Sequence, residues 1–238
     1  MLIDNINIAQ FSAKQWNVKV GHSEIENASE WVPGRLLPVF FRSRSGFKEI
    51  EITLLVKGKN REAIISNRGA VLSLLMETRT LTLDGFTHKF RVILKKSSAT
   101  ESSIHRFHKL VLTFYGYEFG EEVIEMFEST ANIQIQNTGT VYTPLYLEVT
   151  PLTAMEELTI AGVCKDQSQV KDEVVILKNL SAQKSIVFDG EIGLLTEDGV
   201  IKQDADFWSL PCLAPGVNQI DFSSGQVNVT LKWRPRYM

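Results

Sequence analysis

Residues 49–56 read EIEITLLV, and their pattern indicates the class of fold. Every second side chain from Ile50 to Val56 is apolar, and the alternating positions begin with Glu49 and Glu51. A period of two is typical of a half-buried strand. Further strands are predicted at 89–95, 110–117, 133–136, 146–150, 173–177, 185–188, 218–222 and 227–233. The sequence therefore predicts a mainly β protein.

One segment departs from this pattern. Residues 60–77, NREAIISNRGAVLSLLME, carry apolar side chains at helical spacing along a stripe through Ile65, Leu72 and Met76. Ile64, Val71 and Leu75 widen the stripe. Asn60 is suited to cap the first turn. We expect a single amphipathic helix that packs on a sheet as part of a core.

Residues 88–118 predict a long β-hairpin. The strand candidates HKFRVILKK (88–96) and HKLVLTFYGYE (108–118) flank the polar connector SSATESS at 97–103. An exposed connector between two strands predicts an extended arm with its tip at 97–103.

Charge and composition divide the chain into two domains. Residues 119–130, FGEEVIEMFEST, are acidic and show no strand alternation, so we place the boundary near residue 125. The net charge is +3 for 1–125 and −6 for 126–238, which together give the −3 of the whole chain. This asymmetry is too mild for a nucleic-acid binder. The second domain is predicted to be an all-β sandwich.

Several classes of protein are excluded by composition. The chain of 238 residues is 44% hydrophobic and 22% charged, as in ordinary globular proteins. No run reaches the ~18 apolar residues of a membrane helix, and the acidic, polar start is unlike a signal peptide. Cys164 and Cys212 are too few for a disulfide scaffold, so we expect synthesis in a reducing cytoplasm.

No motif predicts catalysis, a metal or a cofactor. His105 and His108 lie on opposite faces if the segment is a strand, and the two cysteines lack a Cys-x-x-Cys spacing. Nucleotide-binding loops and hydrolase motifs are absent from the sequence. The carboxylate pairs that a glycosidase would need are Glu121–Glu122, Glu156–Glu157 and Asp204/Asp206. We interpret these pairs as solvated turns and predict that the protein is not an enzyme.

Two tryptophans of the second domain receive different predictions. Trp233 is in phase with the inward side chains of strand 227–233 and is expected in the core. Trp208 precedes a proline-containing turn, where both burial and exposure are consistent with the sequence. If exposed, Trp208 is a candidate outward contact for a partner protein or a glycan.

Three motifs in the second half of the chain indicate a family. Residues 206–220, DFWSLPCLAPGVNQI, hold a Pro-Gly-x-Asn turn in which Gly216 supplies a positive φ and Asn218 bonds to the backbone. Residues 227–237, VNVTLKWRPRY, are aromatic and basic, and residues 137–144, NTGTVYTP, enter the second domain. In order and spacing these motifs resemble the distal tail proteins of long-tailed siphophages and related prophages.

The resemblance implies a structural protein of the virion tail tip, made in the host cytoplasm. Domain 1–125 would form a homohexameric ring between the tail tube protein and the hub or lysin protein of the baseplate. Domain 126–238 would be a galectin-like β-sandwich that faces outward and anchors receptor-binding proteins in some relatives. DNA would pass through the ring without specific binding, along a neutral or acidic lining, and no membrane or cofactor is implied.

Under this hypothesis the 88–118 hairpin contacts neighbouring subunits. The predicted interface residues are Lys89, Arg91, Lys95, Lys96, Arg106 and Lys109. The alternative hypothesis is a carbohydrate-binding module or adhesin that uses an exposed Trp208. The second domain contains no histidine, so the sugar-binding cluster of true galectins is absent from it.

Overall fold

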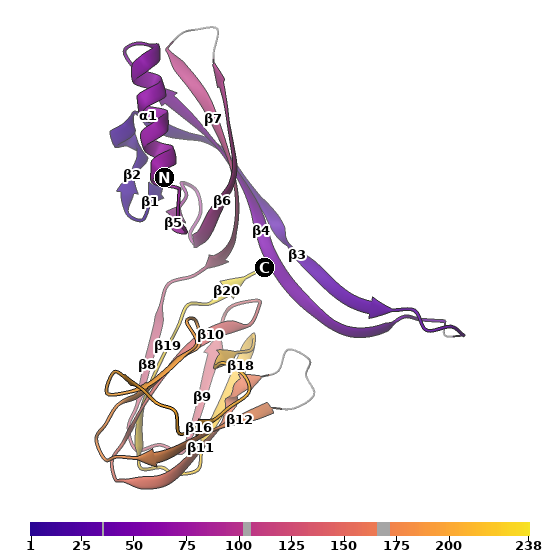
Figure 1. Cartoon of the computed structure of the whole chain (residues 1–238), viewed down its shortest axis with the longest axis vertical. Helices are drawn as coiled ribbons and strands as arrows, with labels where there is room; N and C mark the ends of the chain where they lie inside the picture. Colours follow the sequence, from indigo (N-terminus) through magenta and orange to yellow (C-terminus); the bar gives the residue numbers. More distant parts are fainter. Residues whose placement is uncertain (35, 102–105, 166–171) are drawn as a thin grey trace. The chain divides into compact units, whose positions relative to one another are not determined.

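The structure is a computed structural model that describes residues 1–34, 36–101, 106–165 and 172–238. It divides into two compact units. The first comprises Met1–Glu26, Arg44–Gly120 and Met238, and the second comprises Asn27–Ser43 and Glu121–Tyr237. Apart from α1 (Arg61–Ser73) and the short 3-10 helix η1 (Ile8–Phe11), the elements of the described chain are strands (Figure 1), which confirms the predicted mainly β class.

The strands β1 to β7 of the first unit form one sheet. Its strands run in the order β2–β1–β5–β6–β7–β4–β3. They are β1 (Leu2–Ile3), β2 (Ile6–Asn7), β3 (Ala13–Glu30), β4 (Val39–Lys57), β5 (Arg79–Thr82), β6 (Lys89–Glu101) and β7 (Phe107–Phe119). The segment EIEITLLV lies in β4, and its alternation buries Ile50, Ile52, Leu54 and Val56 in the core of this unit.

Helix α1 begins at the predicted cap. The Oδ1 atom of Asn60 accepts a hydrogen bond from the backbone N–H of Ala63 at 2.8 Å, which satisfies one of the free donors of the first turn. Glu62 lies in that turn, close to the positive end of the helix dipole. The helix ends at Ser73, before the predicted end at residue 77.

The face of α1 that meets the core is rotated from the predicted centre of its stripe. Ile64 and Val71 are buried, and Leu75 just beyond the helix is buried as well, whereas Ile65 and Met76 are exposed. Adjacent helical residues point about 100° apart, so a sheet that covers Ile64 leaves Ile65 facing away. The three residues expected to widen the stripe therefore form its centre.

Two antiparallel sheets form the second unit. One runs β15–β14–β13–β10–β19–β8, with β17 paired to β10, and the other runs β16–β12–β11–β18–β9. The strands are β8 (Val123–Phe127), β9 (Asn132–Asn137), β10 (Thr143–Pro151), β11 (Met155–Lys165), β12 (Asp172–Leu180), β13 (Ile186–Asp189), β14 (Leu194–Glu197), β15 (Val200–Ile201), β16 (Ala205–Asp206), β17 (Cys212–Leu213), β18 (Gly216–Phe222) and β19 (Val227–Trp233). The short strand β20 (Arg236–Tyr237) follows in the chain and belongs to neither of these two sheets. The strands predicted from the sequence all coincide with observed strands, to within one residue at 185–188.

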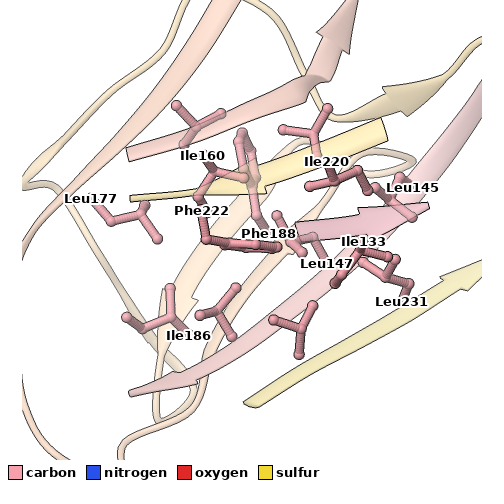
Figure 2. Packing of buried hydrophobic residues seen from close by; sticks show 14 of the residues in the cluster. Ile133, Leu145, Leu147, Ile160, Leu177, Ile186, Phe188, Ile220, Phe222 and Leu231 are labelled. Atoms are coloured by element: carbon pink, nitrogen blue, oxygen red, sulfur yellow. The ribbon is translucent and has the colours of Figure 1, made fainter. Parts of the chain in front are cut away.

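The core of the second unit lies between its two sheets (Figure 2). Leu147 and Leu231 from one sheet pack with Ile160 and Ile220 from the other. Inward and outward side chains alternate along β10 and β19, as expected for sheets packed face to face. Trp233 is buried, which confirms its predicted place in the core.

Strand β8 corrects the prediction for residues 119–130. The sequence indicated no strand there, but Val123–Phe127 pairs with β19 along its whole length. The alternation is hidden because Ile124 and Met126, on the outer side, are apolar as well as exposed. The division between the units falls between Gly120 and Glu121, a few residues before the predicted boundary.

Two buried asparagines hold the turn that precedes β18. Asn218 accepts a hydrogen bond from the backbone N–H of Ala214 at 2.9 Å and donates to the carbonyl oxygens of Ala214 (2.8 Å) and Gly216 (3.1 Å). From another side, the Nδ2 of Asn137 donates to the carbonyl oxygens of Leu213 and Ala214 at 3.4 and 3.2 Å. Gly216 has a φ of +88°, as predicted for this turn. Two of the three family-like motifs, 137–144 and 206–220, thus meet in one polar network inside the sandwich.

Candidate interaction surfaces

The β6–β7 hairpin carries all six basic residues predicted to contact neighbouring subunits. Lys89, Arg91, Lys95 and Lys96 lie on β6, Lys109 lies on β7, and Arg106 directly precedes β7. All except the partly buried Lys89 are exposed. The structure therefore places the six on one hairpin and spreads them along its length.

Two of these cations are bound within their own chain. The Nζ of Lys95 lies 3.3 Å from Glu49 Oε2, contacts the hydroxyl of Tyr115 and sits 4.0 Å from the centre of that ring. The hydrogen bond to Tyr115, with a smaller contribution from Glu49, raises the pKa of Lys95. Arg91 donates to the hydroxyl of Thr80 at 3.1 Å. Both side chains are held against the sheet rather than extended from it.

The connector of this hairpin is shorter than predicted. Strand β6 continues through residues 97–101, which pair with residues 108–112 of β7. The prediction of a loop there was wrong. Strands pair through hydrogen bonds between their backbone N–H and C=O groups, and polar side chains do not prevent these bonds. Glu101 is also held by Arg61 of α1 at 2.8 Å. The remainder of the predicted tip, 102–105, lies outside the described residues.

A second hairpin, made by β3 and β4, was missed by the sequence reasoning. Strand β7 pairs with β4 only from Lys48 to Lys57. Beyond Lys48, β3 and β4 continue side by side (Figure 1). A Cβ added at Gly46 would lie 3.3 Å from the Cβ of Glu24, so these residues face each other across the ribbon. We call residues 24–46 the arm.

The end of the arm is apolar and exposed. Trp31 is 66% exposed, Leu36 94% and Leu37 75%. None of the side chains described between residues 24 and 46 is buried. An isolated two-stranded ribbon is marginally stable in water, and clustered apolar side chains on a surface mark interaction sites. The arm is therefore a candidate surface for binding another molecule.

Trp208 lies on a loop that is anchored on both sides. Before it, β16 pairs with β12, and the ring of Phe207 packs against buried Phe188 with 4.6 Å between ring centroids. After it, the carbonyl oxygen of Ser209 accepts a hydrogen bond from the thiol of Cys164 at 3.1 Å. The backbone is thus fixed, while the indole is 93% exposed. This exposure is what a contact with a partner protein or a glycan requires.

The thiol of Cys164 is predicted to be unreactive in the folded protein. Burial, with smaller contributions from Cys212 and Glu173, raises the pKa of Cys164 to about 12. At pH 8 only about one molecule in 10⁴ then carries the reactive thiolate. In a Cys212→Ser variant we expect maleimide labelling at pH 8 to be about 1,000-fold slower in the folded chain than in urea. Comparable rates in the two states would mean that Cys164 is accessible.

Of the three carboxylate pairs considered for a glycosidase, Asp204/Asp206 is engaged by lysines. Asp204 lies 2.8 Å from the Nζ of Lys202, and Asp206 lies 2.5 Å from the Nζ of Lys178. The hydrogen bond from Lys202 is the largest of the interactions that lower the pKa of Asp204. A catalytic acid needs a raised pKa, so Asp204 is unsuited to that role.

A cleft of about 350 Å³ in the second unit is lined by charges of both signs. Arg234 lies 3.0 Å from Glu122 at its wall, and the Nζ of Lys232 lies 4.6 Å from the ring centre of Tyr146. These groups already bind one another, so the cleft indicates no particular ligand.

The described part of the chain offers neither a metal-binding cluster nor a membrane-spanning helix. Within the described ranges, no three His, Cys, Asp or Glu side chains are grouped to hold a metal ion. His108 is buried on β7, and His105 lies outside the described residues. No helix in the described part of the chain is long and apolar enough to cross a membrane.

The fold of this chain matches that of a known phage protein along its entire length. The solved structure described as "SPP1 Dit (gp 19.1) Protein, a Paradigm of Hub Adsorption Apparatus in Gram-positive Infecting Phages" superposes with a TM-score of 0.76. The match covers 100% of this chain and 98% of that chain, at 15% sequence identity. The chain has the fold of SPP1 Dit. At the level of the fold, this confirms the resemblance inferred from the three motifs.

Other comparisons add less. Two structures of the phage p2 baseplate in its activated conformation, one with Ca and one with Sr, match with TM-scores of 0.49 and 0.46. They are 10% and 11% identical over 96% and 95% of this chain, and each match covers 92% of the other chain. No protein-family model matches the sequence, and no curated protein matches it.

Proposed function

We propose that this protein is a structural hub component of a phage tail tip, a distal tail protein without enzymatic activity. The observation that carries the proposal is the fold match to SPP1 Dit, because it includes both units and nearly the full length of both chains. A chance likeness of one sandwich would leave the unit with α1 and the long hairpins unmatched. The three sequence motifs support the same conclusion independently of the coordinates.

In this role the protein forms a ring of six identical subunits. Domain 1–125 is the ring-forming part and uses two surfaces, the arm and the β6–β7 hairpin with its six basic residues. A head-to-tail contact repeated around a closed ring satisfies every copy equally. It also covers strand edges and apolar tips that would otherwise promote aggregation.

The proposed partners follow from the position of such a ring. The tail tube protein binds on one side, the hub or lysin protein binds on the other, and the galectin-like domain 126–238 faces outward, where receptor-binding proteins attach. Trp208 is proposed as a contact for a partner protein. DNA passes through the ring, whose lining we expect to be neutral or acidic, because cationic walls would hold phosphates and slow passage. The protein is made in the host cytoplasm and functions in the virion tail tip.

The mass of the purified protein tests the ring. Six copies of the 26.8 kDa chain give about 161 kDa by mass photometry, and negative-stain images should show a ring with a central hole. A different closed oligomer would contradict the hexamer. Arg and Lys side chains along the lumen of an experimental ring structure would contradict the expected lining.

The alternative function, a carbohydrate-binding module or adhesin, is supported by the exposure of Trp208, since sugar rings stack on exposed aromatic faces. It predicts a 26.8 kDa monomer that binds glycans on an array and loses this binding in a Trp208→Ala variant. That pair of results would replace the hub proposal.

A further inference from the structure

Among the strands that the structure describes, β9 is the one outer strand of the second unit without the usual protection of a sheet edge. One sheet ends in β15 and β8, and the other ends in β16 and β9. β15 and β16 are only two residues long, and β8 carries Glu125 on the same side as the half-buried Val123 and Phe127. Short strands and inward-pointing charges hinder the addition of a further strand. β9 has six residues, NIQIQN, with no charge and no proline.

The ladder between β9 and β18 is regular. Six successive residue pairs run from Asn132 with Asp221 to Asn137 with Gly216, without a shift in register. In an antiparallel pair, alternate residues direct their N–H and C=O groups away from the neighbouring strand. Within the described residues, no other strand pairs with β9. Its outer edge therefore presents an uninterrupted row of backbone donors and acceptors.

The side chains of β9 are divided between two faces. Ile133 and Ile135 are buried in the core between the sheets, whereas Gln134 and Gln136 are exposed. A strand added beside β9 would continue both faces, with apolar side chains on the inner face and polar side chains on the outer one. Strand addition of this kind takes its affinity from backbone hydrogen bonds and its specificity from alternate side chains. The chemistry of the edge thus specifies an extended peptide segment as its occupant.

The surroundings of this edge are acidic. Residues 121–130, which contain β8 and lead into β9, hold four glutamates and neither lysine nor arginine. One of the four, Glu122, is paired with Arg234 at 3.0 Å. Domain 126–238 carries a net charge of −6, so a second copy of the chain would bring the same negative charge to the contact. Charge therefore favours a segment of a different protein that is rich in lysine or arginine.

We propose that the outer edge of β9 binds an extended basic segment of another tail-tip protein, which adds a strand to the sheet β16–β12–β11–β18–β9. The inference rests on the proposed attachment of further proteins to domain 126–238, and it names the surface and the mode of binding. Because β18 already pairs with every residue of β9, the edge is preformed, and only the incoming segment becomes ordered on binding.

Three synthetic peptides test the edge on the full chain. The first alternates valine with lysine over about eight residues, the second has glutamate in place of every lysine, and the third has Pro-Pro in place of the central Val-Lys pair. Fluorescence anisotropy should show binding of the lysine peptide and at least tenfold weaker binding of the other two, because glutamate is repelled and proline lacks the backbone donor. Amide hydrogen exchange within residues 132–137 should slow when the lysine peptide is bound.

Variants of the chain locate the contact. Gln134→Lys with Gln136→Lys places two cations on the exposed face of β9, so the lysine peptide should bind at least tenfold more weakly and the glutamate peptide more tightly. The matched control is Gln183→Lys with Gln203→Lys, which adds the same charge at exposed positions elsewhere on the second unit. This control should change the binding of either peptide by no more than about twofold.

The outcomes separate this inference from its alternatives. Equal binding of the lysine and proline peptides, or equal losses in the two double variants, would mean attraction by overall charge alone and would overturn the inference. Oligomers of the chain that dissociate on the Gln134→Lys and Gln136→Lys changes would assign the edge to a second copy and overturn it as well. Mass photometry of the unmodified chain reports on the ring separately. Rings without peptide binding refute only the docking edge, and a monomer that binds the lysine peptide through 132–137 refutes only the ring.

Discussion

Replacing Asn218 with alanine is expected to lower the free energy of unfolding of the second unit by about 3 kcal/mol. The side chain is fully buried and makes three hydrogen bonds to the turn before β18. Alanine leaves the N–H of Ala214 and the carbonyl of Gly216 without these bonds, and an unpaired buried polar group costs about 1–3 kcal/mol. Because a domain is stable by only about 5–15 kcal/mol, this single change should remove a large part of its stability.

Urea unfolding followed by tryptophan fluorescence, to which the buried Trp233 of this unit contributes, measures this effect. The matched control is Asn132→Ala, which removes the same kind of side chain from the same pair of strands at an exposed position. The exposed side chain of Asn132 donates to the carboxylate of the partly buried Asp221, so a change within about 0.5 kcal/mol is expected. If both variants lost the same free energy of unfolding, the buried network would stabilise the unit no more than a surface hydrogen bond does.

The same network shows which features the sequence reveals. The Pro-Gly-x-Asn turn and the alternation in β4, β10 and β19 were recognised because their causes are local or follow a simple period. Trp233 was placed correctly for the same reason, since it is in phase with a strand whose other face meets solvent. In each case a residue that the protein's own fold buries leaves a recognisable pattern in the sequence.

The errors have physical causes as well. Strand β8 was missed because its outward residues, Ile124 and Met126, are exposed but apolar. Its sequence therefore lacks the alternation of apolar and polar residues that marks a strand buried on one face. The centre of the α1 stripe was misplaced because Ile64 and Ile65 are both apolar, and only the sheet decides which of them is covered. Residues 97–101 were read as a loop because their polar side chains conceal a paired backbone.

The arm was missed for a deeper reason. Neither core of the chain contains a described residue of the arm. This holds for the glutamates of β3, Glu24, Glu26 and Glu30, and for the exposed apolar residues of the tip. Sequence patterns report which residues the chain itself buries. A segment that another copy would bury carries no such signal, and only its apolar content flanked by Pro33 and Pro38 marks it as unusual.

Shortening the arm is therefore expected to abolish self-association while both units stay folded. Glu24 faces Gly46 across the ribbon, so replacing residues 24–46 with Asn-Gly joins Ser23 to Phe47 by a two-residue hairpin turn. The described side chains that are lost belong to neither core. Mass photometry should show a single chain in place of the assembled ring, with an unchanged circular dichroism spectrum.

A milder variant separates the apolar tip from the ribbon that carries it. Changing Trp31, Leu36 and Leu37 to serine keeps every strand pair, and because all three are exposed, the melting temperature should stay within a few degrees. At an interface, a central tryptophan alone contributes about 2 kcal/mol or more, so the dissociation constant of the ring should rise at least about 100-fold. Serine at Ile65, Met76 and Met126 removes as many exposed apolar side chains elsewhere and should leave the ring intact. Rings that persist in both arm variants would assign the subunit contact to the β6–β7 hairpin, where Lys96→Glu and Lys109→Glu should then dissociate them.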